Sequence, residues 1–92
     1  MIRSFADKQT RELFETGKSR RWSTISRVAV RKLVQIDSVV SLLELNTPPG
    51  NHLEELKGDR SGQHSIRIND QWRICFRWEP DGVYDVEVVD YH

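Results

Sequence analysis

Residues 65–89 read SIRINDQWRICFRWEPDGVYDVEVV, and this stretch determines the fold class. Apolar and polar side chains alternate along it, which is the period of a β-strand with one buried face. Turn-forming residues interrupt the alternation at 69–71 and again at 79–82. The pattern predicts three consecutive antiparallel strands, at residues 65–68, 72–78 and 83–89.

The alternation divides the side chains of these strands between two faces of the sheet. One face, which we expect to be buried, consists of Ile66, Ile68, Trp72, Ile74, Phe76 and Trp78. The opposite face, which we expect to be open to solvent, carries Arg67, Arg73, Cys75 and Arg77. Arginines on a solvated sheet face usually serve solubility, so they do not by themselves indicate a function.

The N-terminal half of the chain has a helical period instead. A short strand from Ile2 to Phe5 should precede a helix from about Asp7 to Thr16, with Asp7 as its N-cap and Gly17 as its C-terminal stop. Apolar residues at three- and four-residue spacing then predict a second helix from about Ser23 to Ser41.

The order β-α-α-β-β-β predicts an α+β fold, in which a small antiparallel sheet has two N-terminal helices packed on one face. Two adjacent prolines and a glycine at 48–50 predict a loop, which is too short to be a linker between domains. We therefore expect residues 1–92 to form one domain, since a chain of this length buries too little surface to divide its core.

Composition narrows the class of protein. Hydrophobic residues make up 37% of the chain and charged residues 30%, which is typical of a globular protein with a solvated surface. The N-terminus lacks the apolar segment of a secretory signal, and the longest uncharged stretch is far shorter than the ~20 residues that span a bilayer. A lone Cys75 excludes an internal disulfide and gives no metal cluster. We expect a cytoplasmic protein without membrane contact, metal or cofactor.

The formal net charge of +0 hides a division along the chain. Residues 1–32 carry a net charge of +6 and residues 33–92 a net charge of −6. A basic helical half and an acidic sheet half can attract each other, so the overall charge does not argue for nucleic-acid binding.

Residues around the predicted strands supply groups that could catalyse RNA cleavage. Lys57 and Arg60 precede the strands, and Asp90-Tyr91-His92 follows the last one. When a ribose 2′-hydroxyl attacks its own phosphate, one group accepts the 2′ proton, another protonates the 5′-oxygen, and cations stabilise the phosphorane. The residues alone give a weak signal, because regular alternation separates Tyr91 from its two neighbours unless the strand bulges or ends near Val89.

Three segments resemble the plasmid-maintenance killer proteins, the HigB branch of the RelE toxins: Gly58-Asp59-Arg60, the stretch from Ser65 to Phe76, and Asp90-Tyr91-His92. The resemblance runs the whole length of the chain. It implies a RelE-like fold and the toxin of a type II toxin-antitoxin system, a ribosome-dependent endoribonuclease that cleaves mRNA in the decoding site without a metal. The implied partners are the 70S ribosome with its mRNA and a helix-turn-helix antitoxin, through which alone the toxin would meet operator DNA.

The resemblance also assigns roles to residues. It implies a catalytic set of Lys57, Arg73, Asp90, Tyr91 and His92. The further arginines expected to contact RNA are Arg60, Arg67 and Arg77. Relatives can carry a histidine where this chain has Glu54, so we expect one acid/base group to be absent and the toxin to be weaker. An acidic antitoxin would dock on the basic segment from Lys18 to Lys32, with Arg20 and Arg21 as its contacts.

Two alternatives stay open. Related folds include toxins that inhibit DNA gyrase by contact alone, because a fold does not fix a function. A gyrase inhibitor has no need of Lys57, Arg73 and the Asp90-Tyr91-His92 tail. The second alternative is a weakened toxin that serves mainly as a partner in a repressor complex, and its only support is Glu54.

Overall fold

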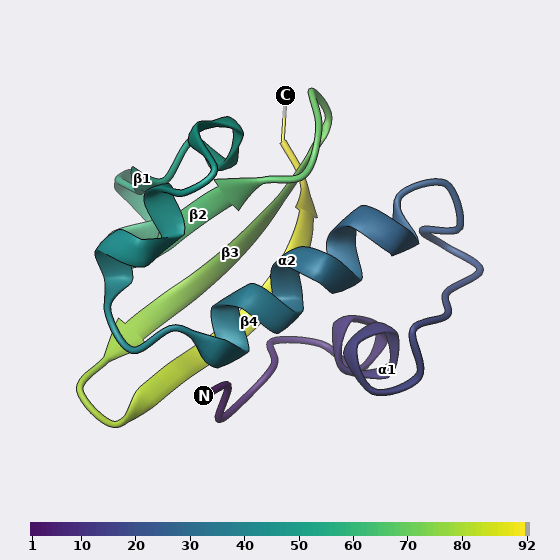
Figure 1. Ribbon diagram of the computed structural model, residues 1–92, viewed down its shortest axis with the longest axis horizontal. Coiled ribbons are helices and arrows are strands. Elements are labelled where there is room, and N and C mark those ends of the chain that lie inside the picture. Colours follow the sequence, from purple (N-terminus) through teal and green to yellow (C-terminus); the bar gives the residue numbers. More distant parts are fainter. Residues whose placement is uncertain (92) are drawn as a thin grey trace.

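The computed structural model describes residues 1–91, in which two helices pack on one face of a four-stranded antiparallel sheet (Figure 1). The helices are α1 (Lys8–Thr16) and α2 (Ser26–Ser38). The strands lie in sequence order and are β1 (Glu54–Glu55), β2 (His64–Arg67), β3 (Trp72–Glu79) and β4 (Gly82–Asp90). The predicted α+β class, the antiparallel sheet and the two helices on one face are confirmed.

Local sequence signals fix the ends of α1 as predicted. The carboxylate of Asp7 accepts a hydrogen bond of 2.6 Å from the backbone N–H of Thr10. Gly17 ends the helix with a φ of 74°, and its N–H donates to the carbonyl of Leu13. A residue with a Cβ is strained at such a φ, which is why glycine suits this position.

Helix α2 is shorter than the predicted range of 23–41. Its last residue is Ser38, because the carboxylate of Glu44 accepts hydrogen bonds from the backbone N–H groups of Val40 and Ser41. These bonds start a 3₁₀ helix, η1 (Leu42–Asn46). A second short 3₁₀ helix, η2 (Pro49–Asn51), lies in the predicted proline loop. The apolar period beyond Ser38 therefore belongs to a different element.

The N-terminal segment does not form a regular strand. Ile2 and Phe5 make isolated parallel bridges to Val83 and Val86, and these bridges run along the outer edge of β4. The pairing protects the backbone of an edge strand that would otherwise be open to other chains. The predicted strand at residues 2–5 does pair with the sheet, but only through two isolated bridges and not through a continuous run of paired residues.

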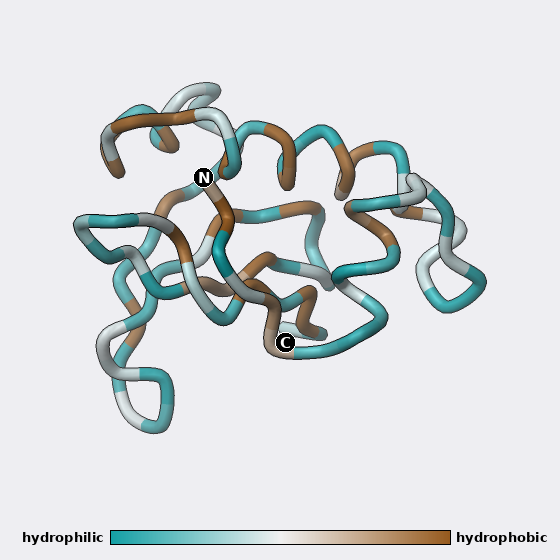
Figure 2. The backbone as a smooth tube through the Cα atoms, turned by 90° about the horizontal axis from the view of Figure 1, so that it is seen from below, coloured by the Kyte–Doolittle hydropathy of each residue, from teal (hydrophilic) through white to brown (hydrophobic). Residues whose placement is uncertain are grey.

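The core lies between the helices and one face of the sheet. In Figure 2 the hydrophobic positions of α2 recur with each helical turn, as the sequence period requires. Residues with no more than 1% exposure from the helices and their connecting turn meet buried strand residues there: Leu13, Trp22, Ala29, Leu33 and Ile36 pack with Ile66, Ile74, Phe76, Val83 and Val86. The predicted apolar face of the strands is therefore the helix-covered face.

A β-bulge interrupts the pairing of β3 with β4. Cys75 is opposite Glu87, whereas Arg77 is opposite Tyr84, so β4 contains one extra residue between these pairs. Asp85 lies in this irregular stretch with a φ of 56°. The bulge keeps Val83 on the core face and turns Tyr84 to the side of Arg77. This bulge is not the irregularity near Val89 that a convergence of Asp90, Tyr91 and His92 would require, because it lies earlier in the strand.

Candidate active site

Arg73 is buried rather than exposed on an open sheet face. The residue is 6% exposed, and its Nε donates 2.8 Å to the hydroxyl of Ser65. Its Nη2 donates 2.6 Å to the backbone carbonyl of His52. The expectation of an open face was wrong here, because the segment that precedes β2 folds against this face. Cys75, also expected to be open, is fully buried for the same reason.

Glu54 belongs to this site, although from the sequence we considered it only as the position where a catalytic histidine is missing. It lies on β1, a strand of two residues that no sequence pattern predicted, and pairs with Ser65. This pairing brings its Oε2 to 4.0 Å from Nη2 of Arg73. Half of the Glu54 side chain is exposed, so the carboxylate remains accessible to a substrate. The site therefore contains a possible proton acceptor, the Glu54 carboxylate, beside a group that can bind phosphate, the Arg73 guanidinium.

Tyr91 completes the cluster from the other end of the chain. The Cζ atom of Arg73 lies 5.3 Å from the centre of the Tyr91 ring, within the range of a cation–π contact. The ring is 41% exposed. The structure therefore brings together Glu54, Arg73 and Tyr91, and leaves one side of the group open to solvent.

Asp90 lies on a different face from Tyr91. It pairs with Trp72 in the ladder, and its Oδ2 accepts a hydrogen bond of 3.2 Å from Nε2 of Gln71. His92 lies outside the described residues. The predicted convergence of Asp90, Tyr91 and His92 therefore remains a prediction. Lys57, the other predicted cation, is exposed at the start of the 3₁₀ helix η3 (Gly58–Arg60).

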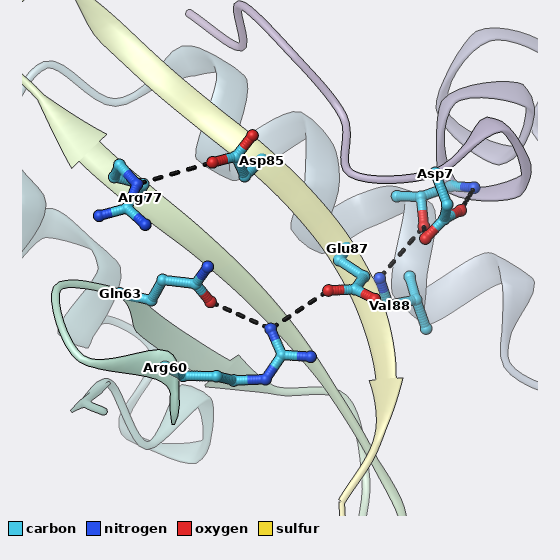
Figure 3. A network of polar contacts seen from close by, with 8 residues as sticks. Asp7, Arg60, Gln63, Arg77, Asp85, Glu87 and Val88 are labelled. Carbon is cyan, nitrogen blue, oxygen red and sulfur yellow. Dashed lines mark hydrogen bonds and ion pairs between the residues drawn. The ribbon is translucent and has the colours of Figure 1, made fainter. Parts of the chain in front are cut away.

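Each of the three arginines expected to contact RNA is already paired with a carboxylate. Arg60 lies 3.2 Å from Glu87 and also donates to Gln63, and Arg77 lies 3.6 Å from Asp85 (Figure 3). Arg67 is bound to the carboxylate of Asp70. The face that carries these cations is consequently close to electrically neutral.

Comparison with known proteins decides the family. Residues 3–92 match the family described as the RelE-like toxin of type II toxin-antitoxin system HigB. The chain belongs to this HigB family of toxins. It is 37% identical to "Toxin HigB-1" of Vibrio cholerae, over 100% of this chain and 98% of that protein. It is 36% identical to "Endoribonuclease HigB" of Proteus vulgaris over the full length of both.

Solved structures show the same fold at low identity. The YoeB-YefM complex from Staphylococcus aureus contains a chain that matches with a TM-score of 0.57 and 17% identity, covering 100% of this chain and 98% of that one. The YoeB dimer from Staphylococcus aureus matches with a TM-score of 0.56. The RelE-like fold that the sequence predicted for this HigB-family toxin is confirmed.

A buried polar network holds the loop that carries His52. Nζ of Lys32 on α2 donates to the side-chain oxygen of Asn51, which is fully buried. The Asn51 amide donates 3.0 Å to the carbonyl of Leu45 and 3.3 Å to that of Thr47. Burial, with the nearby Arg31 and Arg67, lowers the pKa of the Lys32 ammonium. Because His52 follows Asn51 directly, the network fixes the carbonyl that binds Arg73.

The surroundings of Cys75 argue against a reactive thiol in this HigB-family chain. Burial raises the pKa of the thiol above its ordinary value of 9.0, while the nearby Arg60 opposes the shift. A thiol that stays protonated is a poor nucleophile. Within residues 1–91, no three His, Cys, Asp or Glu side chains are grouped so that they could hold a metal ion. In the same part of the chain, no helix is long and apolar enough to cross a membrane.

The helical side of the molecule carries a basic groove of about 570 Å³. It is lined by Gln9, Glu12, Lys18, Ser19, Arg20, Arg21 and Ser23. Arg21 is held in place, because its Nη1 donates to the side chain of Gln9 and its guanidinium lies 5.0 Å from the centre of the Trp22 ring. The two arginines predicted to contact an antitoxin thus line one groove, away from Arg73.

Proposed function

We propose that this HigB-family toxin is a ribosome-dependent endoribonuclease that cleaves mRNA in the decoding site by attack of the ribose 2′-hydroxyl. The observation that carries the proposal is the juxtaposition of Glu54, Arg73 and Tyr91, with the carboxylate 4.0 Å from the guanidinium and the phenol ring stacked beside it. The name of the Proteus vulgaris relative, "Endoribonuclease HigB", supports the reaction class.

Glu54 takes the proton that leaves the 2′-hydroxyl. The 2′-oxygen then forms a bond to phosphorus, the bond from phosphorus to the 5′-oxygen breaks, and the products are a 2′,3′-cyclic phosphate and a 5′-hydroxyl. Relatives can carry a histidine at this position, and we expected this chain to lack the corresponding acid/base group. In this proposal, Glu54 supplies that group. Positioned acid/base groups contribute ~10²–10⁴-fold to a rate.

Arg73 stabilises the charge that builds on the phosphorane oxygens. Its Nε donates to the hydroxyl of Ser65, and its Nη2 donates to the carbonyls of His52 and Ser65, so the guanidinium is held in one orientation before substrate arrives. Lys57 adds a second cation, and Tyr91 stacks on a base or orients the scissile nucleotide. We assign protonation of the departing 5′-oxygen to His92.

The ribosome supplies the positioning that the toxin lacks. A protein holds RNA mainly by neutralising phosphates with lysine and arginine, and this chain has a net charge of +0. Its candidate RNA-binding arginines are paired with carboxylates. We therefore propose that it acts in the cytoplasm on mRNA already held in the A site, and that free RNA is a poor substrate.

The test is cleavage of a defined mRNA on purified 70S ribosomes, mapped by primer extension. We expect cuts in the A-site codon, products that end in a 2′,3′-cyclic phosphate, and no cutting when the scissile nucleotide is 2′-deoxy. Efficient cleavage of the same mRNA without ribosomes at physiological salt would refute the ribosome dependence. Inhibited translation with intact mRNA would favour a toxin that acts by binding alone.

We further propose that a helix-turn-helix antitoxin binds the basic groove of Arg20 and Arg21 through acidic residues. The groove lies on the helical side, so the antitoxin can cover the toxin without filling the site of Arg73. Operator DNA would then contact only the antitoxin. No cofactor takes part in this scheme.

A further inference from the structure

Two carboxylates of β4 hold two of the arginines that are expected to bind RNA (Figure 3). Oε1 of Glu87 lies 3.2 Å from Nη1 of Arg60, and Oδ2 of Asp85 lies 3.6 Å from Nε of Arg77. All four side chains are 30–50% exposed, which leaves them screened by solvent only in part. The two carboxylates therefore occupy the positions next to the guanidinium groups where RNA phosphates would bind.

The bulge in β4 creates this arrangement. Asp85 adopts a φ of 56°, a left-handed conformation that Asp and Asn tolerate better than most residues. Its carboxylate consequently reaches Arg77 on the same face on which Glu87 reaches Arg60. On the other side, Gly62 has no side chain, and a Cβ there would lie 2.9 Å from Nη1 of Arg77. The guanidinium of Arg77 is thus held between a loop backbone and a carboxylate.

We propose that Asp85 and Glu87 are specificity-determining residues that keep free single-stranded RNA off the sheet face. They do so by occupying the two guanidinium groups that its phosphates would bind. The inference rests on the proposed function. An RNA strand in solution has to displace both carboxylates from the arginines before it can bind. The mRNA fixed in the decoding site has a high effective concentration near the arginines, so its phosphates can displace the carboxylates.

The test measures binding of free RNA without any cleavage step. The probe is a single-stranded 2′-O-methyl oligonucleotide, which has no free 2′-hydroxyl and cannot be cut. The variant is Asp85→Asn with Glu87→Gln, which keeps the size of both side chains and the left-handed preference at position 85. The matched control is Glu15→Gln with Glu55→Gln, which removes the same two charges from exposed residues on α1 and β1.

We expect tighter and more salt-dependent binding by the Asp85→Asn/Glu87→Gln variant. Each freed arginine should steepen the slope of log K against log[salt] by ~0.7, which corresponds to ~5-fold in affinity at 0.1 M salt relative to 1 M, or ~25-fold for both. The control pair should bind like the wild type. Adding Arg60→Gln and Arg77→Gln to the variant should abolish the gain, because the gain requires those two cations.

Three results would overturn the inference: unchanged affinity and slope in the variant, an equal gain in the control pair, or a gain that survives removal of both arginines. None of these results would contradict the proposed function, which is tested separately by cleavage of mRNA on ribosomes with the wild-type protein. Conversely, tighter binding by the variant together with no ribosomal cleavage by the wild type would reject the endoribonuclease and leave the role of the two carboxylates in RNA binding intact.

Discussion

The Nε atom of Arg73 donates a hydrogen bond of 2.8 Å to the hydroxyl of Ser65, and both side chains are buried. A buried arginine is costly to hold in place unless its donors have partners. Here a neighbouring strand and the carbonyl of His52 supply them. Ser65 is therefore a positioning residue for the proposed catalytic cation.

Replacing Arg73 with alanine should lower the rate of cleavage on ribosomes by ~10²–10³-fold, as for loss of one preorganised donor to a developing oxyanion. The change also leaves the partners of Arg73 without a donor, at a cost of ~1–3 kcal/mol for each unsatisfied group. Urea unfolding must therefore accompany the kinetics, with the exposed Arg27→Ala as the control. A folded Arg73→Ala protein that cuts at the wild-type rate would remove Arg73 from the mechanism.

Ser65→Ala should lower kcat and leave KM unchanged, because it frees the orientation of Arg73 without removing the charge. The control is Ser61→Ala, which removes the hydroxyl of an exposed loop serine. Single-turnover cleavage over a range of ribosome concentrations separates the two constants. A raised KM with an unchanged kcat would show that Ser65 does not position the reacting group.

Glu54→Gln should reduce cleavage by ~10²–10⁴-fold, since the amide cannot accept the 2′ proton. Glu54→His should retain much of the activity, because an imidazole restores a proton acceptor at the same place. The measurement is the single-turnover rate on programmed ribosomes, with Glu55→Gln on the same strand as the control. Equal rates for Glu54→Gln and the wild type would exclude Glu54 as the base.

Asn51→Ala should destabilise the fold by about 3 kcal/mol, because a hydrogen bond to a buried charged group contributes ~1.5–3 kcal/mol and two carbonyls also lose their donor. Adding Lys32→Met should recover part of the loss, because the ammonium left without its acceptor is then gone. Urea unfolding of the two single variants and the double variant measures the coupling. Strictly additive effects would show that Lys32 and Asn51 do not stabilise each other.

The thiol of Cys75 should make the fold sensitive to alkaline pH. Its pKa in the folded protein is raised above 9.0, so the folded state holds the proton more tightly than the unfolded state does. The resulting stability is fully present below pH 9.0 and is lost as the pH rises through the folded pKa. Cys75→Ala should lack this decline.

The pH comparison separates Cys75 from a second alkaline group. The pKa of Tyr84 is also raised, first by the hydrogen bond that its hydroxyl donates to Asp81. Tyr84 is present in both proteins, so subtracting the unfolding free energy of Cys75→Ala from that of the wild type at each pH isolates the thiol. A difference that stays constant from pH 8 to pH 11 would contradict the prediction.

Charge reversal at Arg20 and Arg21 should weaken antitoxin binding and flatten its salt dependence, because both line the basic groove. Lys8→Glu is the control, since it reverses an exposed charge that does not line that groove. Titration calorimetry at several salt concentrations gives the affinities. If Arg20→Glu/Arg21→Glu binds the antitoxin like the wild type, the interface lies elsewhere.

The sequence by itself determined the elements whose signals are local. The alternation over 65–89 predicted three strands and the helix-facing side of the sheet, and Asp7 and Gly17 marked both ends of α1. Such signals act within a few residues. Successive side chains of a strand point to opposite faces of the sheet, and α1 ends where Gly17 adopts a left-handed conformation. The resemblance to HigB proteins then implied catalytic roles for Arg73 and Tyr91.

Only the tertiary structure decided what covers the second face of the sheet and where its charges lie. Glu54 reaches Arg73 because a two-residue strand pairs with β2, and two residues are too few to leave a pattern. Asp85 reaches Arg77 because β4 bulges between its pairs with Cys75 and Arg77. The first contact joins β1 and β3, which lie on either side of β2, and the second lies within the hairpin of β3 and β4. Neither can be read from a local pattern, because each depends on how neighbouring strands pair.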